Sequence, residues 1–207
     1  MKSLSIRRLP HVPLKFVFLA VALAAVLSCG GHDLTQASQD LCNCQPKEPW
    51  SFDFRHAEKH IGLPSGPATP VTVQTILSWP QHEIVPDGPR QGRENRLFQV
   101  NQAYLQWASV QTGDCDLHLE ISATPDKNAP RVMVETPVDS EYCPARRTLQ
   151  AQLEQRGRTL TQTEGGELPQ PFLVSVQGLA FEDFEHNRGT AQLATSWELH
   201  PAIVTLQ

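Results

Sequence analysis

Acidic and histidine side chains recur in the C-terminal half of the chain at spacings that could build a metal or catalytic site. Eight of them fall in four short motifs: Asp114, Asp116, His118, Glu135, Asp183, His186, Glu198 and His200. Carboxylate oxygens and imidazole nitrogens are the ligands expected of Zn²⁺, Mn²⁺ or Mg²⁺. A metal with an open coordination position would lower the pKa of bound water and hydrolyse a phosphate or acyl ester, with a spare Glu or His as general base.

Each of these residues also fits an ordinary structural role. Asp114 follows a glycine and is typical of a turn, a strand histidine is commonly hydrogen-bonded, and Glu198 could face solvent. A structural polar network is therefore a third interpretation, beside a ligand site and a hydrolase site. His56 and His60 stand in the string H-A-E-K-H, which is neither H-E-x-x-H nor H-x-x-E-H, and the pattern favours a solvated helix face.

The elements that must position these residues form a β-rich domain over 94–207. Hydrophobic alternation predicts strands at 96–110, 116–122, 131–135, 172–181 and 196–206, with a helix at 145–157. Pro201 in the last strand indicates an edge position or a β-bulge. This order is that of an OB-fold, a five-stranded Greek-key barrel; the alternative is a generic α+β sheet with the helix on one face. The expected fold is thus mainly β (α+β) and OB-fold-like.

In such a barrel we expect the eight polar residues to meet at one mouth. The loops that join strands one to two and four to five bind ligands in OB-folds. Asp116 and His118 share a face of the second strand, because alternate residues of a strand point the same way. Hairpin pairing then places Glu135, on the third strand, beside them.

Residues 1–28 have the pattern of an export signal. A basic segment precedes an uncharged apolar run over 16–27, which is shorter than the roughly 20 residues that a spanning helix needs. The sequence from Val26 to Gly31 resembles a bacterial lipobox, in which Cys29 becomes the lipidated first residue; an ordinary secretory leader is the alternative. Gly30 after this cysteine implies sorting to the outer membrane, where the acyl chains would hold the protein.

Four further cysteines then remain in an oxidising compartment, which favours disulfides. The hairpin that places the second and third strands side by side brings Cys115 close to Cys143, and we expect a disulfide between them. Cys42 and Cys44 would then form a short-loop disulfide, remain free thiols or link two molecules. They could also be half of a metal site, but no second pair follows at zinc-finger spacing.

The remaining composition limits the function classes. Removal of the four leader cations leaves 13 basic and 22 acidic residues, a net charge of −9. A chain this acidic is repelled by a phosphate backbone unless a metal intervenes, so nucleic acid is not an expected partner. Residues 29–49 are polar and predict a flexible tether. Residues 50–93 predict an irregular N-terminal arm, in which 71–77 alternates like a strand.

Four segments resemble a bacterial family of secreted proteins. They are Gly113–His118, Val132–Pro137, Gly178–His186 and Trp197–Pro201. The family pattern is D-x-D-x-H, E-x-P, G-x-x-F-x-D-x-x-H and E-L-H-P, and the resemblance covers roughly 94–206. This chain has Cys115 where the family tends to have Gly. The resemblance implies one domain with these polar residues in common, and it implies no established activity.

The sequence therefore predicts an exported lipoprotein of the cell envelope, held at the membrane by its lipid anchor. The leading function is a ligand-binding or interaction module, with an envelope ligand or protein as the partner. The alternative is a metal-dependent hydrolase, of phosphodiesterase or nuclease type, that uses zinc or manganese at the Asp/His/Glu cluster. Whether the protein is an enzyme stays open at this level.

Overall fold

The computed structural model describes residues 40–47, 54–82, 87–184 and 190–207. The predictions for the leader, Cys29 and His186 concern residues outside these ranges. No helix in the described part of the chain is long and apolar enough to cross a membrane.

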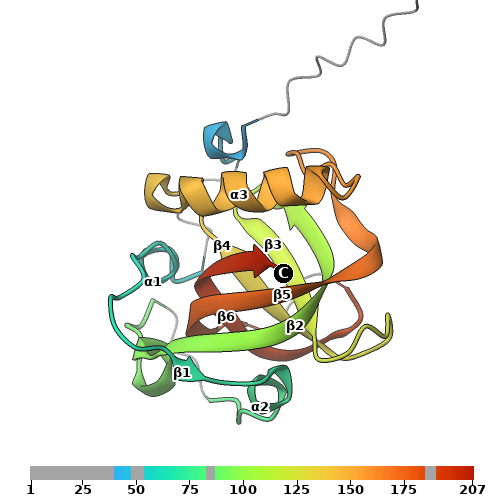
Figure 1. Ribbon diagram of the computed structural model, residues 1–207. Helices are drawn as coiled ribbons and strands as arrows, with labels where there is room; N and C mark the ends of the chain where they lie inside the picture. Colours follow the sequence, from blue (N-terminus) through green and yellow to red (C-terminus); the bar gives the residue numbers. More distant parts are fainter. Residues whose placement is uncertain (1–39, 48–53, 83–86, 185–189) are drawn as a thin grey trace, which may run out of the picture. The chain divides into compact units, whose positions relative to one another are not determined.

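Five strands close into a mixed β-barrel (Figure 1). They are β2 (Leu97–Val110), β3 (Leu117–Ser122), β4 (Arg131–Thr136), β5 (Gly166–Glu182) and β6 (Leu193–Leu206). Their order is β2-β3-β4-β6-β5, and an antiparallel pairing of β5 with β2 closes the barrel. Only β4 and β6 pair in parallel among the described strands of the barrel. This is the order of an OB-fold. The barrel prediction is confirmed, and the open sheet is excluded.

The strand predictions agree with the structure except at some ends. The fourth predicted strand is longer than expected, because β5 already begins at Gly166. Pro201 lies where the β5–β6 register shifts, between the pairs Gly178–Ala202 and Ala180–Leu199, so its prediction of a bulge is confirmed.

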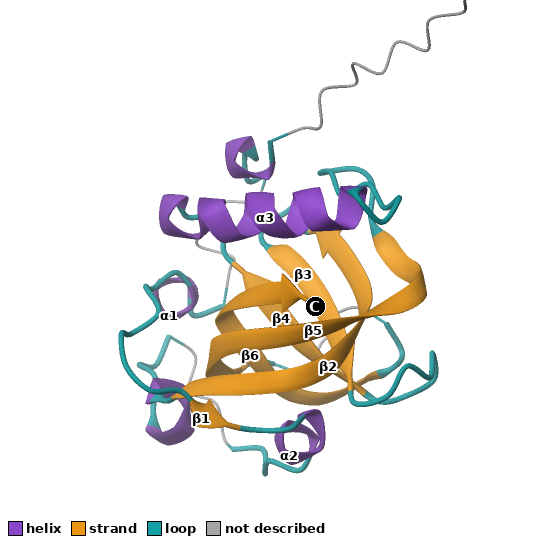
Figure 2. Ribbon diagram, viewed as in Figure 1, coloured by secondary structure: helices purple, strands orange, loops and turns teal. Residues whose placement is uncertain are grey.

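Helices close the two ends of the barrel (Figure 2). α3 (Cys143–Glu154) crosses one end, and α2 (Val73–Leu77) lies at the opposite end. Leu149 of α3 and Ile76 of α2 both join the hydrophobic core. The short helical segments are η1 (Leu41–Asn43), α1 (His56–Lys59), η3 (Gly92–Asn95) and η4 (Ser140–Tyr142).

The predicted strand at 71–77 is wrong. Only β1 (Thr69–Pro70) is extended there; it pairs in parallel with β2, outside the barrel. The Thr72 hydroxyl accepts a hydrogen bond from Thr75 N and caps α2. Val73 and Ile76, three residues apart, are buried on the same side of this helix. Helix capping by Thr72 therefore outweighs the alternation of apolar and polar residues, which favoured a strand.

The predicted disulfide Cys115–Cys143 is also wrong. The structure pairs Cys42 with Cys143 and Cys44 with Cys115. The segment 40–47 supplies the partners of both predicted cysteines. Arg146 holds this segment, because one of its nitrogens donates to both Leu41 O and Cys115 O. The end of the predicted tether is thus fixed to the barrel.

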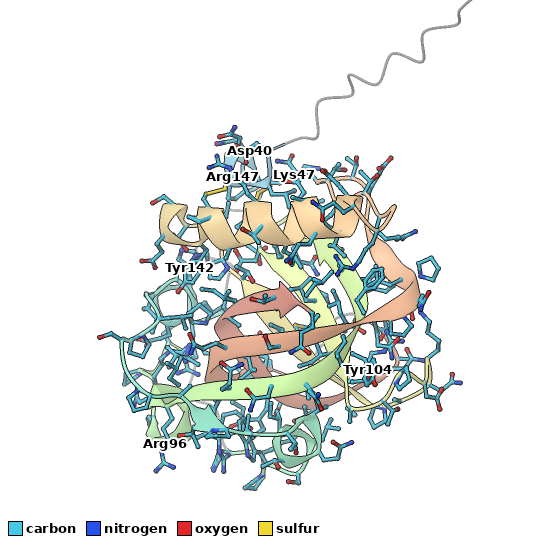
Figure 3. The ribbon with its side chains drawn as sticks, in the orientation of Figure 1. Asp40, Lys47, Arg96, Tyr104, Tyr142 and Arg147 are labelled. Atoms are coloured by element: carbon cyan, nitrogen blue, oxygen red, sulfur yellow. A yellow bond between two sulfur atoms is a disulfide. The ribbon has the colours of Figure 1, made fainter. Side chains whose placement is uncertain are left out.

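Surface contacts support the same attachment on the outer side of α3. Arg147 of α3 forms an ion pair with Asp40, with 2.6 Å between Nη2 and Oδ2, and the two side chains lie together in Figure 3. Lys47 N donates a hydrogen bond to Gly113 O.

The predicted arm packs against the barrel through buried ion pairs. Arg55 makes a two-pronged pair with Glu94, at 2.7 and 3.0 Å, and both side chains are buried. The Glu94 carboxylate also accepts a hydrogen bond from Glu182 N, at the end of β5. Arg90 donates to Ala180 O and His200 O on β5 and β6. The arm and the barrel therefore form one compact unit.

Acid should weaken this attachment through Glu94. Burial raises the pKa of Glu94, but the hydrogen bonds from Arg55 and from two backbone N–H groups outweigh it, so the pKa lies below its ordinary value. The carboxylate thus stabilises the folded state at neutral pH, and the stabilisation is lost as the pH falls through the folded pKa. We expect Glu94→Gln to lower the free energy of unfolding at pH 7 and to flatten its decline below about pH 4.5.

Urea unfolding at several pH values measures this effect. Glu154→Gln, at the C-terminus of α3, serves as the control and should leave the acid limb unchanged. An acid limb that is equally steep in wild type and Glu94→Gln would contradict the prediction.

Candidate functional site

Most of the polar residues singled out by the sequence lie on the outer wall of the barrel. In β3, β4 and β6 they alternate with residues of the hydrophobic core, such as Leu117, Val134 and Leu199. Alternate residues of a strand point to opposite faces, so the polar side chains point away from the core. They are nevertheless buried, with exposed fractions of 0 to 7%. The outer wall is therefore a second buried layer.

Asp116, Glu135 and His200 form the centre of this layer. One potential ligand atom from each lies within 4.8 Å of the others. His200 Nε2 is 3.2 Å from Asp116 Oδ2, and His200 Nδ1 is 2.9 Å from Glu135 Oε2. Asp116 comes from the loop before β3 and is fixed by Val138 N, which donates to its Oδ1 at 2.9 Å.

Two of these buried atoms pair with each other but make no well-aligned hydrogen bond. Asp116 Oδ2 and His200 Nε2 form an ion pair at 3.2 Å, and neither has a hydrogen bond of good geometry with a described residue. The other ring nitrogen of His200 bonds Glu198 Oε1 at 3.2 Å. Buried polar atoms without a hydrogen bond are uncommon in native proteins and indicate a missing ligand, water or ion. These two atoms therefore mark the place where a ligand could bind.

His118 extends the cluster along β3. Its Nδ1 lies 3.3 Å from Glu135 Oε1, so Glu135 contacts both His118 and His200. Its Nε2 lies 3.4 Å from Glu120 Oε1. Glu120 in turn accepts from Arg131 at 3.0 Å and from Thr190.

The carboxylates give this layer a strong attraction for positive charge. Burial lowers the pKa of His200, but Asp116 and Glu135 outweigh it and raise the value to about 9. Burial acts in the same way on His118, and Glu120 and Glu135 raise its pKa to about 9. Burial raises the pKa of Glu135, yet the two imidazoles hold it well below its usual range. A site that favours protons on its histidines also favours a metal cation, which competes with those protons.

We expected these residues to meet at one mouth of the barrel, and this prediction is wrong. β2 and β5 run antiparallel, so the loop after β2 and the loop after β5 begin at opposite ends of the barrel. The five residues that meet do so along the wall between those ends: Asp116, His118, Glu135, Glu198 and His200.

The other three predicted residues do not join them. Asp114 supports the turn before β3, since its Oδ1 accepts a hydrogen bond from Asp116 N at 2.9 Å. Asp183 pairs with Lys59 of α1 at 3.2 Å, beyond the end of β5. His186 lies outside the described residues.

Two members of the buried layer, Glu120 and Arg131, were not predicted from the sequence. Glu120 follows His118 at the same alternate spacing, and this signal could have found it. Arg131 pairs with it from the neighbouring strand. The predicted solvated face of His60 is wrong: its side chain is only 8% exposed, and its Nδ1 bonds Asp139 Oδ2 at 2.7 Å. Nothing local in H-A-E-K-H indicates that contact, because Asp139 is far away in the sequence.

The arm supplies a cover for this wall. Figure 1 shows α1 beside the β4 and β6 side of the barrel. Arg55, Lys59 and Arg90 surround the ring of Phe181, with their charged groups 4.6 to 5.6 Å from its centre. Tyr142 lies between α3 and the α1 segment (Figure 3), and its hydroxyl donates to Ile61 O.

The donor set can hold a divalent ion. Two ligands of a tetrahedral zinc ion with bonds of about 2.0 to 2.1 Å lie about 3.3 Å apart. The separation of Asp116 Oδ2 and His200 Nε2, 3.2 Å, fits this value. One imidazole with two carboxylates suits zinc or manganese.

Comparison with protein-family models, curated proteins and solved structures finds no match to this chain. Its candidate site therefore rests on its own geometry.

The buried ion pairs of this wall give a prediction about stability. Arg131 bonds two carboxylates: Glu120, which is fully buried, and Glu167, whose side chain is 40% exposed. Glu120→Gln leaves charges uncompensated in the interior, and we expect it to lower the free energy of unfolding by about 3–5 kcal/mol. Glu167→Gln removes a solvent-screened partner of the same arginine and should cost at most about 1 kcal/mol. Urea denaturation measures both, and equal losses would contradict the role given to burial.

Proposed function

We propose that the protein is an exported, lipid-anchored binding module of the cell envelope, and that the ligand of its barrel is a divalent metal ion. Asp116, Glu135 and His200 hold the ion, and zinc or manganese suits this donor set. One observation carries the proposal. Asp116 Oδ2 and His200 Nε2 are buried, form an ion pair at 3.2 Å and make no well-aligned hydrogen bond with the described residues.

Two features support export and anchoring. The leader and the lipobox-like sequence at Cys29 favour lipidation, with the outer membrane as the destination. Two disulfides, Cys42–Cys143 and Cys44–Cys115, suit an oxidising compartment outside the cytoplasm.

The burial of Asp116 and His200 favours a site that binds metal without catalysing hydrolysis. A hydrolytic metal needs an open coordination position that water and substrate can reach. Asp116 and His200 are each 1% exposed, and the arm covers the wall on which His200 lies. The hydrolase expected as the alternative would need this cover to move.

Metal content tests the proposal directly. We expect the full-length lipidated protein, purified in detergent, to retain about one equivalent of zinc or manganese, measured by elemental analysis. Asp116→Asn and His200→Ala remove ligands and should abolish the bound metal while circular dichroism stays that of a folded β-protein. Glu167→Gln, on a carboxylate outside the cluster, should keep it.

A metal-free wild type that also binds no added zinc or manganese would overturn the metal site. If Asp116→Asn then lost stability as well, the cluster would be an ion network that serves the fold.

Lipidation has its own test. Cells that produce the protein and receive labelled palmitate should label the wild type, and Cys29→Ser should remove the label and release the protein from the membrane fraction. Cys44→Ser is the control, because a cysteine in a disulfide should not alter lipidation. Label that persists in Cys29→Ser would contradict the anchor.

A further inference from the structure

His60 brings a second imidazole from the arm to the proposed metal site. It ends α1, and its side chain is 8% exposed. Its Nε2 lies 4.0 Å from Asp116 Oδ2, the same oxygen that faces Nε2 of His200 at 3.2 Å. The two rings are 6.3 Å apart, centre to centre, and meet edge to face. Asp116 Oδ2 thus lies between a histidine of the barrel and a histidine of the arm.

The two histidines are oriented in the same way. His60 Nδ1 bonds Asp139 Oδ2 at 2.7 Å. His200 Nδ1 bonds Glu198 Oε1 at 3.2 Å and also lies 2.9 Å from Glu135 Oε2. In metalloproteins a ligating histidine commonly donates its second ring nitrogen to a carboxylate, which fixes the ring and makes the ligating nitrogen more basic. Both imidazoles here have this second carboxylate, and both turn Nε2 toward Asp116.

From this arrangement, and resting on the proposed function, we infer that His60 is a ligand of the same metal ion. Asp116, Glu135 and His200 of the barrel and His60 of the arm then supply four protein ligands. Four protein ligands around a tetrahedral ion make a closed, structural site, whereas catalytic zinc sites keep one position for water or substrate. The three barrel ligands already lie within 4.8 Å of one another, whereas His60 is outside that group and reaches only Asp116 among its members, at 4.0 Å. Ligation by His60 therefore requires α1 to move its imidazole closer to the other ligands when the ion binds.

The consequence is that the metal clamps the arm to the barrel. α1 contains only four residues, too few for a helix to be stable alone, so its position depends on its contacts. The Arg55–Glu94 pair holds the residue before α1, and the Lys59–Asp183 pair holds its last residue. A metal bond at His60 would hold its end, directly over the wall that carries Asp116 and His200.

The decisive variant is His60→Asn in the full-length protein. The Asn amide can replace the Nδ1–H bond to Asp139 but has no atom at the position of Nε2, so it separates the structural contact from metal ligation. We expect its zinc affinity, measured by competition with a chromogenic chelator, to fall about 100-fold or more. His56→Asn is the matched control, since His56 lies on the same turn with its ring 3.9 Å from that of His60, and it should bind zinc as the wild type does.

Asp139→Asn tests the orienting carboxylate while His60 stays in place. Loss of such an outer partner commonly lowers metal affinity about 10- to 100-fold, and we expect that range here.

Hydrogen exchange provides a readout that does not depend on affinity. Zinc should slow amide exchange of residues 55–63 in the wild type and in His56→Asn, but not in His60→Asn. If the wild type binds zinc while His60→Asn binds it equally and 55–63 gains no protection, the inference is overturned and the proposed function stands. If the wild type binds no zinc or manganese, the proposed function fails and this inference fails with it.

Discussion

The structure depends on charge that is buried outside the hydrophobic core. Removing an ion from water costs several kcal/mol even after relaxation, and the cost is offset only when every charge has a partner of good geometry. On the outer wall of this barrel Glu120 has Arg131, and where the arm attaches Glu94 of η3 has Arg55. The arm covers part of this layer, with Lys59 paired to Asp183 and His60 4.0 Å from Asp116.

The cost of buried charge also explains why Asp116 Oδ2 and His200 Nε2 are the atoms that matter most for ligand binding. Asp116 Oδ2 and His200 Nε2 face each other as an ion pair without a well-aligned hydrogen bond, and Arg131 Nε on the same wall also lacks a hydrogen bond. A cation bound between the Asp116 and His200 side chains would complete the network.

The barrel was predictable because strand alternation is a local signal. β3 and β4 bury both faces, yet their apolar residues still alternate with polar ones, so strand order and hairpin pairing followed from the sequence. The mouth was predicted wrongly because two loops that bind ligands in OB-folds were assumed to share an end. The disulfides were predicted wrongly because the pairing of neighbouring strands says nothing about a third segment, 40–47, whose two cysteines bond Cys143 and Cys115.

The residues of the candidate site also differ in whether a local sequence pattern reveals them. Asp116, His118 and Glu135 were found because alternate spacing and hairpin register place them together. His60 was missed because its partner Asp139 lies 79 positions further along the chain, and a helix of one turn looks solvated when its packing is unknown. Distant contacts made by irregular segments leave no periodic trace in a sequence.

The Cys44–Cys115 bond makes the arm part of a covalent ring. Its two cysteines are 71 positions apart, and the whole arm lies within that interval. If the arm detaches from the wall it cannot diffuse away, because both of its ends remain fixed to the barrel, and its local concentration stays high. The chain toward the N-terminus enters the domain just before this ring, at Cys42. A pulling force applied through a membrane anchor would therefore pass into α3 and the loop before β3, and the arm would carry none of it.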